Sequence, residues 1–216
     1  MIHNICTDNS IASKYVADLR DVHKQADSVH FRKNMELLGS IFAYEISKTF
    51  KYEKVRTETP LGTAISEVPV EDVVLLTIMR AGLPIHQGML NVLGNVDNGF
   101  IAAQRLHHKD GSFEVAVDYI TCPEVEGRTV IISDPMLASG SSMANALEAV
   151  YNIGKPKRVH VVSIIAASYG LNYVRRLYPK AHFWIAAQDE ELTAKSYIVP
   201  GLGDAGDLAY GGKRDV

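Results

Sequence analysis

The segment SDPMLASGSS, residues 133–142, combines residue types that can bind an anion. It follows the apolar run TVII and precedes MANALEAVYNIG, whose apolar residues have helical spacing. The start of a helix presents backbone N–H groups and the positive end of the helix dipole, and Ser139, Ser141 and Ser142 add hydroxyl donors. Gly140 would let the backbone approach a bound oxyanion. The segment therefore predicts a phosphate-binding loop.

Asp134 indicates which class of phosphate ligand this loop would bind. A carboxylate and a phosphate repel each other, so we expect Asp134 to face sugar hydroxyls or a bound cation, which predicts a sugar phosphate as the ligand. The loop is not a Walker A motif, because it contains no lysine. The alternative is that Ser141 or Ser142 only caps a helix and that Asp134-Pro135 only makes a turn.

A second segment, MRAGLP at 79–84, repeats the arrangement of strand, turn and helix start. Gly82 permits a tight turn, and Pro84 suits the first turn of a helix. Arg80 lies where the strand ends and could bind a second phosphate group. The alternative is a surface arginine in an exposed ion pair.

The third segment is GLGDAGD at 201–207, where small residues leave the backbone N–H and C=O groups uncovered. Such a backbone can recognise a flat heterocycle: the edge of uracil presents acceptor, donor and acceptor, which N–H, C=O and N–H groups can match. The alternative is a flexible glycine tail. A calcium loop is disfavoured, because the DxDxDG spacing and the closing glutamate are absent.

The surrounding elements must bring these segments together. Helical spacing at 11–48, with a break at Asp27-Ser28, predicts two helices with Ser28 as a cap, and β-prone runs at 51–67 predict a hairpin. From residue 73 onwards, short apolar runs alternate with helix-period segments, which predicts a mostly parallel sheet covered on both faces. Ligands of such sheets bind at the carboxyl ends of the strands. The runs FIAAQRL and FEVAVDYI around HHKDG predict an antiparallel arm, and the glycine-rich tail from 197 predicts no regular structure.

Composition predicts one domain spanning residues 1–216. The chain is 47% hydrophobic, and its net charge of -3 gives no basic field for nucleic acid or an anionic membrane. Cys6 and Cys122 form no CxxC pair, so we expect neither disulfides nor a zinc ribbon, and a reducing, cytoplasmic setting. The apolar runs are too short to span a bilayer, and the first residues lack a signal-peptide pattern.

The sequence resembles the uracil phosphoribosyltransferase family over roughly residues 25–212, through the segments HFRKNMELLGSIFAYE, IMRAGLP, SDPMLASGSS and YIVPGLGDAGD. The last of these is close to diagnostic for that family. The resemblance implies the type I phosphoribosyltransferase fold: a mostly parallel central sheet flanked by helices, with N-terminal helices and a projecting β-arm at about 100–122. It also implies transfer of phosphoribose from PRPP to uracil, giving UMP and pyrophosphate with Mg²⁺.

The resemblance assigns roles to individual residues. Those matching Arg80 and Arg105 bind the pyrophosphate of PRPP, and Asp204, in the C-terminal loop at about 197–212, faces both PRPP and uracil; these three are the catalytic candidates. The ribose 5-phosphate and its hydroxyls are held by residues matching Asp134, Pro135, Met136, Leu137, Ala138, Ser139, Gly140, Ser141 and Ser142. The uracil pocket is lined by residues matching Ile198, Gly203, Asp204 and Ala205.

The chain departs from the wider phosphoribosyltransferase pattern at several positions. Pro135 and Ala138 stand where many of these enzymes have an acidic residue and an aspartate base, a loss shared by the uracil enzymes, so Asp204 is the remaining candidate for the N1 proton. In the arm, His107 and His108 replace an acidic cluster. Adjacent strand residues point to opposite faces, so we expect solvated turn histidines and no shared metal ion.

Several alternatives stay open. A PRPP or nucleotide sensor that lacks the reaction is one, supported by the altered arm, and an enzyme for another base is a second. The family commonly forms homodimers, and part of it is activated by GTP. The resemblance thus leaves open a homodimer or a higher homo-oligomer, and GTP as an effector.

Overall fold

A computed structural model describes residues 1–107 and 113–212, with the side chains of 103–107 and 113–118 left aside. Arg105 and His107 are therefore placed by their backbone alone, and His108 lies outside the described residues.

The centre of the molecule is a sheet with the strand order β1-β10-β9-β7-β4-β5-β6, and β8 pairs with β9. Its strands are β1 (Ile2–Asn4), β4 (Val73–Met79), β5 (Asp97–His107), β6 (Phe113–Thr121), β7 (Thr129–Ser133), β8 (Met136–Leu137), β9 (Arg158–Ala167) and β10 (His182–Asp189). All pairs are parallel except β5 with β6. The predicted fold class is confirmed. The sequence reading missed β1, because three residues carry no apolar pattern.

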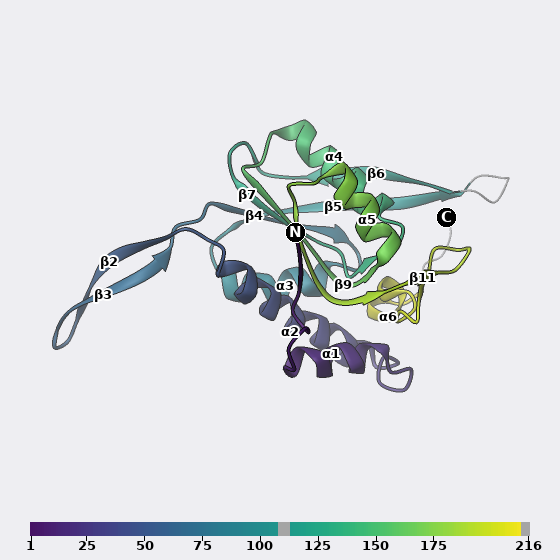
Figure 1. The fold of residues 1–216 in the computed structure, drawn as a ribbon, viewed down its shortest axis with the longest axis horizontal. Helices are drawn as coiled ribbons and strands as arrows, with labels where there is room; N and C mark the ends of the chain where they lie inside the picture. Colours follow the sequence, from purple (N-terminus) through teal and green to yellow (C-terminus); the bar gives the residue numbers. More distant parts are fainter. Residues whose placement is uncertain (108–112, 213–216) are drawn as a thin grey trace.

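Helices cover both faces of the sheet (Figure 1). They are α1 (Ile11–Arg20), α2 (Ser28–Ser47), α3 (Leu83–Leu93), α4 (Ser141–Ile153), α5 (Ser168–Leu177) and α6 (Ala205–Tyr210). Side chains alternate along a strand, so Leu75 belongs to the core cluster on the side of α1, α2, α3 and α6, whereas Leu76 belongs to the cluster on the side of α4 and α5. This two-sided burial explains why the strands read as continuous apolar runs.

Two local predictions were wrong. The carboxylate of Asp27, and not Ser28, caps α2, by accepting hydrogen bonds from the N–H groups of Val29 and His30 at 2.9 and 3.2 Å. The C-terminal tail also contains regular structure: β12 (Ile198–Val199) pairs antiparallel with β11 (Glu191–Leu192), and α6 follows. The helix forms because Asp204 caps it and its alanines are buried in the core shared with α2.

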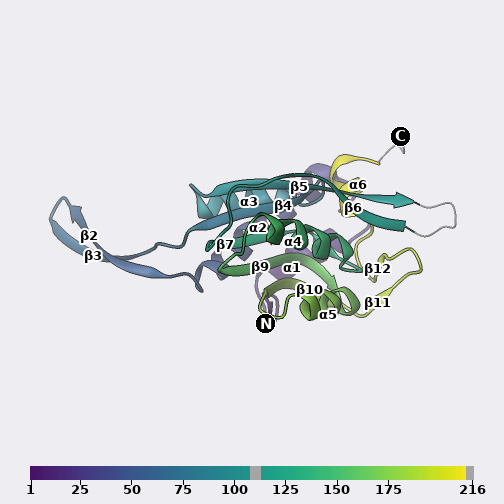
Figure 2. The same ribbon diagram turned by 90° about the horizontal axis from the view of Figure 1, so that it is seen from above.

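Two antiparallel ribbons project from the body at opposite ends (Figure 2). One is the predicted hairpin, now β2 (Tyr52–Thr59) and β3 (Gly62–Pro69), whose strands pair only with each other among the described residues. The other is the predicted arm, formed by β5 and β6. The antiparallel pairing of both segments is confirmed.

Candidate active site

The loops that carry Arg80 and Asp134 begin side by side. They follow β4 and β7, which are parallel neighbours with Thr77 opposite Ser133. The Thr77 hydroxyl donates to the Ser133 carbonyl at 3.1 Å, which ties the two strand ends together. Gly82 packs into this junction, since a Cβ there would lie 2.0 Å from Thr77 Oγ1. The close approach requires glycine and brings the Arg80 loop against the Asp134 loop.

Arg80 reaches the C-terminal segment. It follows a cis Met79–Arg80 peptide bond, and its Nη2 lies 3.4 Å from Asp207 Oδ1 and 3.2 Å from the Gly211 carbonyl oxygen. Both charged side chains are about 40% exposed, so this is a weak surface ion pair. An anionic ligand could take the place of Asp207 as the partner of Arg80. The predicted surface ion pair is thus present, and it joins two of the three predicted ligand segments.

At the start of α4, the predicted phosphate loop supplies one long side-chain hydrogen bond, from the Ser141 N–H to Ser139 Oγ at 3.4 Å. Gly140 is the N-cap residue of α4 with φ of 86°, and no side chain caps the helix from that position. The alternative in which Ser141 or Ser142 caps α4 is therefore wrong. The hydroxyl of Ser139 lies 3.2 Å from that of Ser141, so two hydroxyl groups gather at the positive end of the helix.

Packing adds a reason for glycine at position 140. A Cβ there would lie 2.8 Å from Val174 Cγ2 and 2.9 Å from the Gly170 carbonyl oxygen, both in α5. Gly170 in turn packs against Ala138, where a Cβ would lie 2.2 Å from the carbonyl oxygen. Helix α5 therefore packs against the backbone of the loop at Ala138 and Gly140.

The segment predicted to bind uracil lies against the Arg80 loop. Ile198 and Ala205 are buried, and a Cβ on Gly206 would be 3.8 Å from the Cβ of Ala81. Gly203 has φ of 95°, a conformation that favours glycine. The Oδ1 atom of Asp204 accepts a hydrogen bond from the Asp207 N–H at 3.0 Å. The catalytic candidate on this segment is thus also the cap of α6.

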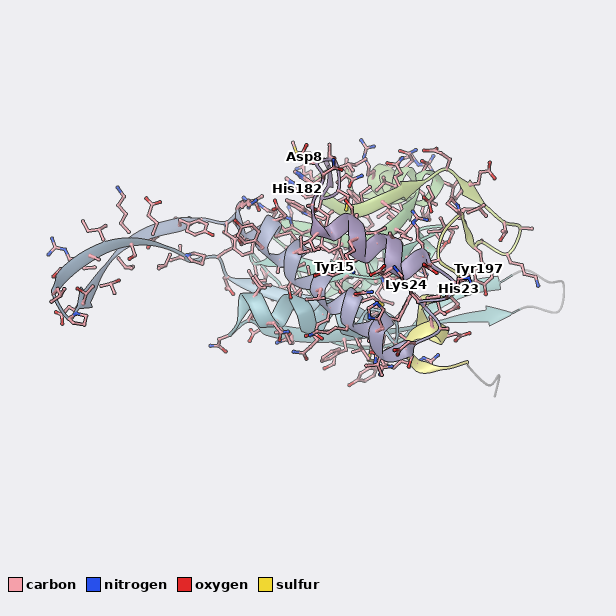
Figure 3. All side chains as sticks on the ribbon, turned by 90° about the horizontal axis from the view of Figure 1, so that it is seen from below. Asp8, Tyr15, His23, Lys24, His182 and Tyr197 are labelled. Atoms are coloured by element: carbon pink, nitrogen blue, oxygen red, sulfur yellow. The ribbon has the colours of Figure 1, made fainter. Side chains whose placement is uncertain are left out.

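The N-terminal helices hold the same segment, which sequence reasoning missed. Arg20, at the end of α1, donates to both carboxylate oxygens of Asp189 and to the Gly201 carbonyl oxygen. Figure 3 shows His23 and Lys24, in the connection between α1 and α2, at the same end of the molecule as Tyr197. Arg20 and Asp189 lie 169 positions apart, so no local pattern could have paired them.

The backbone of Arg105 extends beyond the edge of the sheet. Met79, the last residue of β4, is paired with Ala102 of β5, so Arg105 lies about 10 Å further along the strand. There it is paired with Val115 of β6. The arm therefore leaves the sheet at the edge that carries Arg80, while the side chain of Arg105 is outside the described residues.

A pocket of about 590 Å³ lies next to this site, between α2, α3 and α6. Arg32, Leu83 and Tyr210 contribute to its walls, but none of the predicted PRPP or uracil residues does. Among the side chains that the structure describes, those of 1–102 and 119–212, no three from His, Cys, Asp or Glu gather in a way that could hold a metal ion. No helix in that part of the chain has the length and apolar character needed to cross a membrane.

Comparison with known proteins places this geometry in a family. The family model for uracil phosphoribosyltransferase matches residues 6–212. A uracil phosphoribosyltransferase of Porphyromonas gingivalis is 45% identical over 207 residues, which cover 95% of this chain and 96% of that protein.

Solved structures agree with the fold. A protein from Aquifex aeolicus superimposes with a TM-score of 0.87 at 31% identity, with 98% of both chains covered. A hypoxanthine phosphoribosyltransferase from Staphylococcus aureus, 9% identical, gives a TM-score of 0.50 over 74% of this chain and 76% of that chain, a likeness of fold alone. From the match over nearly its whole length, the chain belongs to the uracil phosphoribosyltransferase family.

Proposed function

We propose that this protein transfers the phosphoribosyl group of PRPP to N1 of uracil, giving UMP and pyrophosphate. One observation carries the proposal: the Arg80 loop, the 134–142 loop and the C-terminal segment meet at one edge of the sheet. The family membership and the names of the relatives support the same reaction. No feature of the described residues favours a sensor or another base.

In this proposal the chain works by positioning and by charge neutralisation. Residues 134–142 bind the ribose 5-phosphate at the start of α4, and Asp134 faces the ribose hydroxyls. Arg80 and Arg105 bind the pyrophosphate. When the bond between C1 and the pyrophosphate oxygen breaks, negative charge returns to the leaving group, and the two arginines stabilise that charge.

The proton on N1 leaves as the bond between N1 and C1 forms. We assign its acceptance to Asp204, directly or through a water molecule. The Oδ1 atom of Asp204 accepts the Asp207 N–H, and this bond fixes the orientation of the carboxylate. Ile198, Gly203 and Ala205 complete the uracil pocket in this proposal.

Mg²⁺ enters the proposal as a companion of PRPP. Its main ligands in this proposal are the oxygens of PRPP, because Mg²⁺ prefers oxygen ligands and is commonly bound through substrate phosphates. Bound to the oxygens of PRPP, the cation would neutralise part of the pyrophosphate charge. A cytoplasmic setting suits the free thiols of Cys6 and Cys122.

Parallel assays test the reaction. Purified protein with PRPP and Mg²⁺ is offered uracil, cytosine, hypoxanthine and orotate, with and without GTP, and nucleotides are separated by chromatography. We expect UMP alone, and a dependence of the rate on GTP would identify an effector. PRPP binding without any nucleotide product would instead make the protein a sensor, and a different nucleotide would reassign the base.

The arm is proposed to close over PRPP and to exclude water. We expect Arg105→Ala to lower turnover by about 10²-fold to 10³-fold, because one group that stabilises the leaving charge is lost. Binding of uracil, measured by calorimetry, should stay within about threefold of wild type. Arg175→Ala, at an exposed position of α5, serves as the control. Unchanged turnover in Arg105→Ala would remove this residue from the mechanism.

We further propose that the protein assembles with a second copy through the β2–β3 hairpin. Every residue of β2 is exposed, Leu61 at the tip is fully exposed, and Ile65 is 71% exposed. A two-stranded ribbon is at best marginally stable alone in water. A second copy packed on the hairpin would cover these apolar side chains.

A further inference from the structure

We infer that Arg20 and Asp189 form a clamp that fixes the peptide groups of Gly201 and so positions the uracil-binding segment. Both would be positioning residues, acting on uracil through the backbone between Ile198 and Gly203. The inference rests on the proposed function, because it assigns a role within the same site.

The clamp is a closed set of four hydrogen bonds. Arg20 Nη1 and Nη2 donate to Asp189 Oδ2 and Oδ1, each at 2.8 Å. Arg20 Nη1 also donates to the Gly201 carbonyl oxygen at 2.9 Å, and the Gly201 N–H donates to Asp189 Oδ2 at 2.9 Å. Because one residue is held by both its N–H and its C=O, its position and its orientation are both determined.

Burial makes this arrangement strong. The side chain of Asp189 is 7% exposed and that of Arg20 is 24% exposed. Burial raises the pKa of Asp189, but the hydrogen bonds from Arg20 and Gly201 and the charge of Arg20 outweigh it, so this pKa lies below its ordinary value. The bidentate, charge-assisted pair is therefore maintained at neutral pH.

The clamp acts on the site because of what flanks Gly201. This residue has φ of 55°, and a Cβ on it would lie 2.2 Å from the Ile198 carbonyl oxygen, so the chain turns sharply there. The turn separates Ile198 from Gly203, two residues proposed to contact uracil. A shift of the Gly201 peptide would move both sides of the pocket.

Loss of the clamp should therefore affect uracil more than PRPP. The segment would have to become ordered when uracil binds, and that cost would appear as weaker uracil binding. The PRPP residues of the 134–142 loop are held separately, through β8 and α5. Turnover at saturating uracil should change little, because the bound segment reaches the same conformation.

Four variants test this. Asp189→Asn keeps the size of the side chain but removes its charge, and Arg20→Met removes the donors. The double variant Arg20→Asp with Asp189→Arg can restore an ion pair. It would, however, place a guanidinium donor against the Gly201 N–H and a carboxylate acceptor against the Gly201 carbonyl oxygen. Arg128→Gln is the matched control: Arg128 pairs with Asp72 and Asp97, is 17% exposed and precedes β7 at the opposite edge of the sheet.

We expect the KM for uracil to rise about tenfold or more in the first three variants, while kcat and the KM for PRPP stay within about threefold. Arg128→Gln should lower the melting temperature and leave the KM for uracil unchanged. Hydrogen exchange of the amides at 198–204 should accelerate in the two single clamp variants and not in the control. Circular dichroism identifies any variant that fails to fold. If one single variant does not fold, the KM for uracil of the other single variant tests the clamp.

Two results would overturn the clamp. The first is an unchanged KM for uracil in folded single variants. The second is a wild-type KM for uracil in the double variant, which would show that the ion pair only joins α1 to β10 and does not act through Gly201. A wild-type protein that forms no nucleotide would instead refute the proposed function and with it the link to uracil. Hydrogen exchange would still report in that case whether Arg20 and Asp189 order the segment.

Discussion

At the scale of single residues, the candidate site depends on glycines that allow segments to approach closely. Gly82 joins the ends of β4 and β7, and Gly140 lets α5 pack against the 134–142 loop. Gly140 meets two requirements together, a φ of 86° and contact with Val174 and Gly170. A side chain at position 140 would therefore both destabilise the fold and displace the 134–142 loop.

We predict that Gly140→Ala destabilises the protein by about 2–4 kcal/mol, from the left-handed conformation and from the displacement of α5. The KM for PRPP should also rise, because the loop shifts with the helix start. Gly94→Ala is the control, since Gly94 has φ of 69° but no atom within 4 Å of an added Cβ. It should cost about 1 kcal/mol and leave the KM for PRPP unchanged. Urea unfolding and steady-state kinetics measure both, and equal effects of the two substitutions would contradict the packing argument.

At the scale of elements, three neighbouring strands carry a stack of aromatic rings at the sheet edge opposite the site. His3 of β1 lies over Trp184 of β10 with ring centroids 4.0 Å apart, and its Nε2 is 3.3 Å from Nδ1 of His182. Trp184 Nε1 donates to Nδ1 of His160 in β9 at 3.0 Å. Figure 3 shows His182 near Asp8, in the N-terminal segment.

This stack should make stability depend on pH. Burial, together with repulsion from His182, Arg158 and His3, lowers the pKa of His160 to about 3. The native state therefore keeps His160 neutral, while the unfolded chain takes up a proton below about pH 6.5. Stability is full above that pH and falls as the pH drops towards the native pKa. His3 and His182, whose pKa values are also lowered, act in the same direction.

Between about pH 7 and pH 5, we predict a loss of about 2 kcal/mol in the free energy of unfolding from His160 alone. Fluorescence of Trp184, the single tryptophan, can follow urea unfolding at both pH values. The loss should shrink in His160→Phe, whatever its stability at neutral pH, and persist in His23→Gln, which alters an exposed histidine. An equal loss in His160→Phe would show that other groups are responsible.

At the scale of the whole molecule, the two ribbons extend in opposite directions from the three-layer body (Figure 2). The β5–β6 ribbon continues two strands of the central sheet, so its base is supported by β4. The β2–β3 ribbon has no third strand among the described residues. Because only the β2–β3 ribbon lacks a neighbouring strand, we propose that this ribbon, and not the β5–β6 ribbon, contacts the second copy.

We predict that the protein is a homo-oligomer in solution, and that the double variant Leu61→Glu with Ile65→Glu weakens assembly by about tenfold or more, because charges replace buried apolar contacts. Ile153→Glu, at an exposed position of α4, is the control. Sedimentation over a range of protein concentrations gives the masses. A wild-type protein that stays monomeric at all concentrations would contradict the proposal.

The sequence by itself determined the fold class and indicated three candidate ligand segments, because both depend on local patterns. Apolar runs that alternate with helical segments favour a covered, mostly parallel sheet, and such a sheet places the carboxyl ends of its parallel strands at one edge. Arg80 and Asp134 could therefore be expected near each other, whereas the sheet pattern did not place Gly203 of the C-terminal tail. The sequence prediction was wrong at the start of α2, where Asp27 and Ser28 are both possible caps, and at α6, where small residues hide the helical pattern.

Tertiary structure alone decided what holds the site in place. The pairing of Arg20 with Asp189 joins residues far apart in the sequence, and neither residue belongs to a motif. The packing of Gly140 on α5, and the addition of β1 to the sheet edge, likewise depend on contacts between distant segments. Local patterns reveal which residues could bind a ligand, whereas the residues that fix their positions become visible only when the chain has folded.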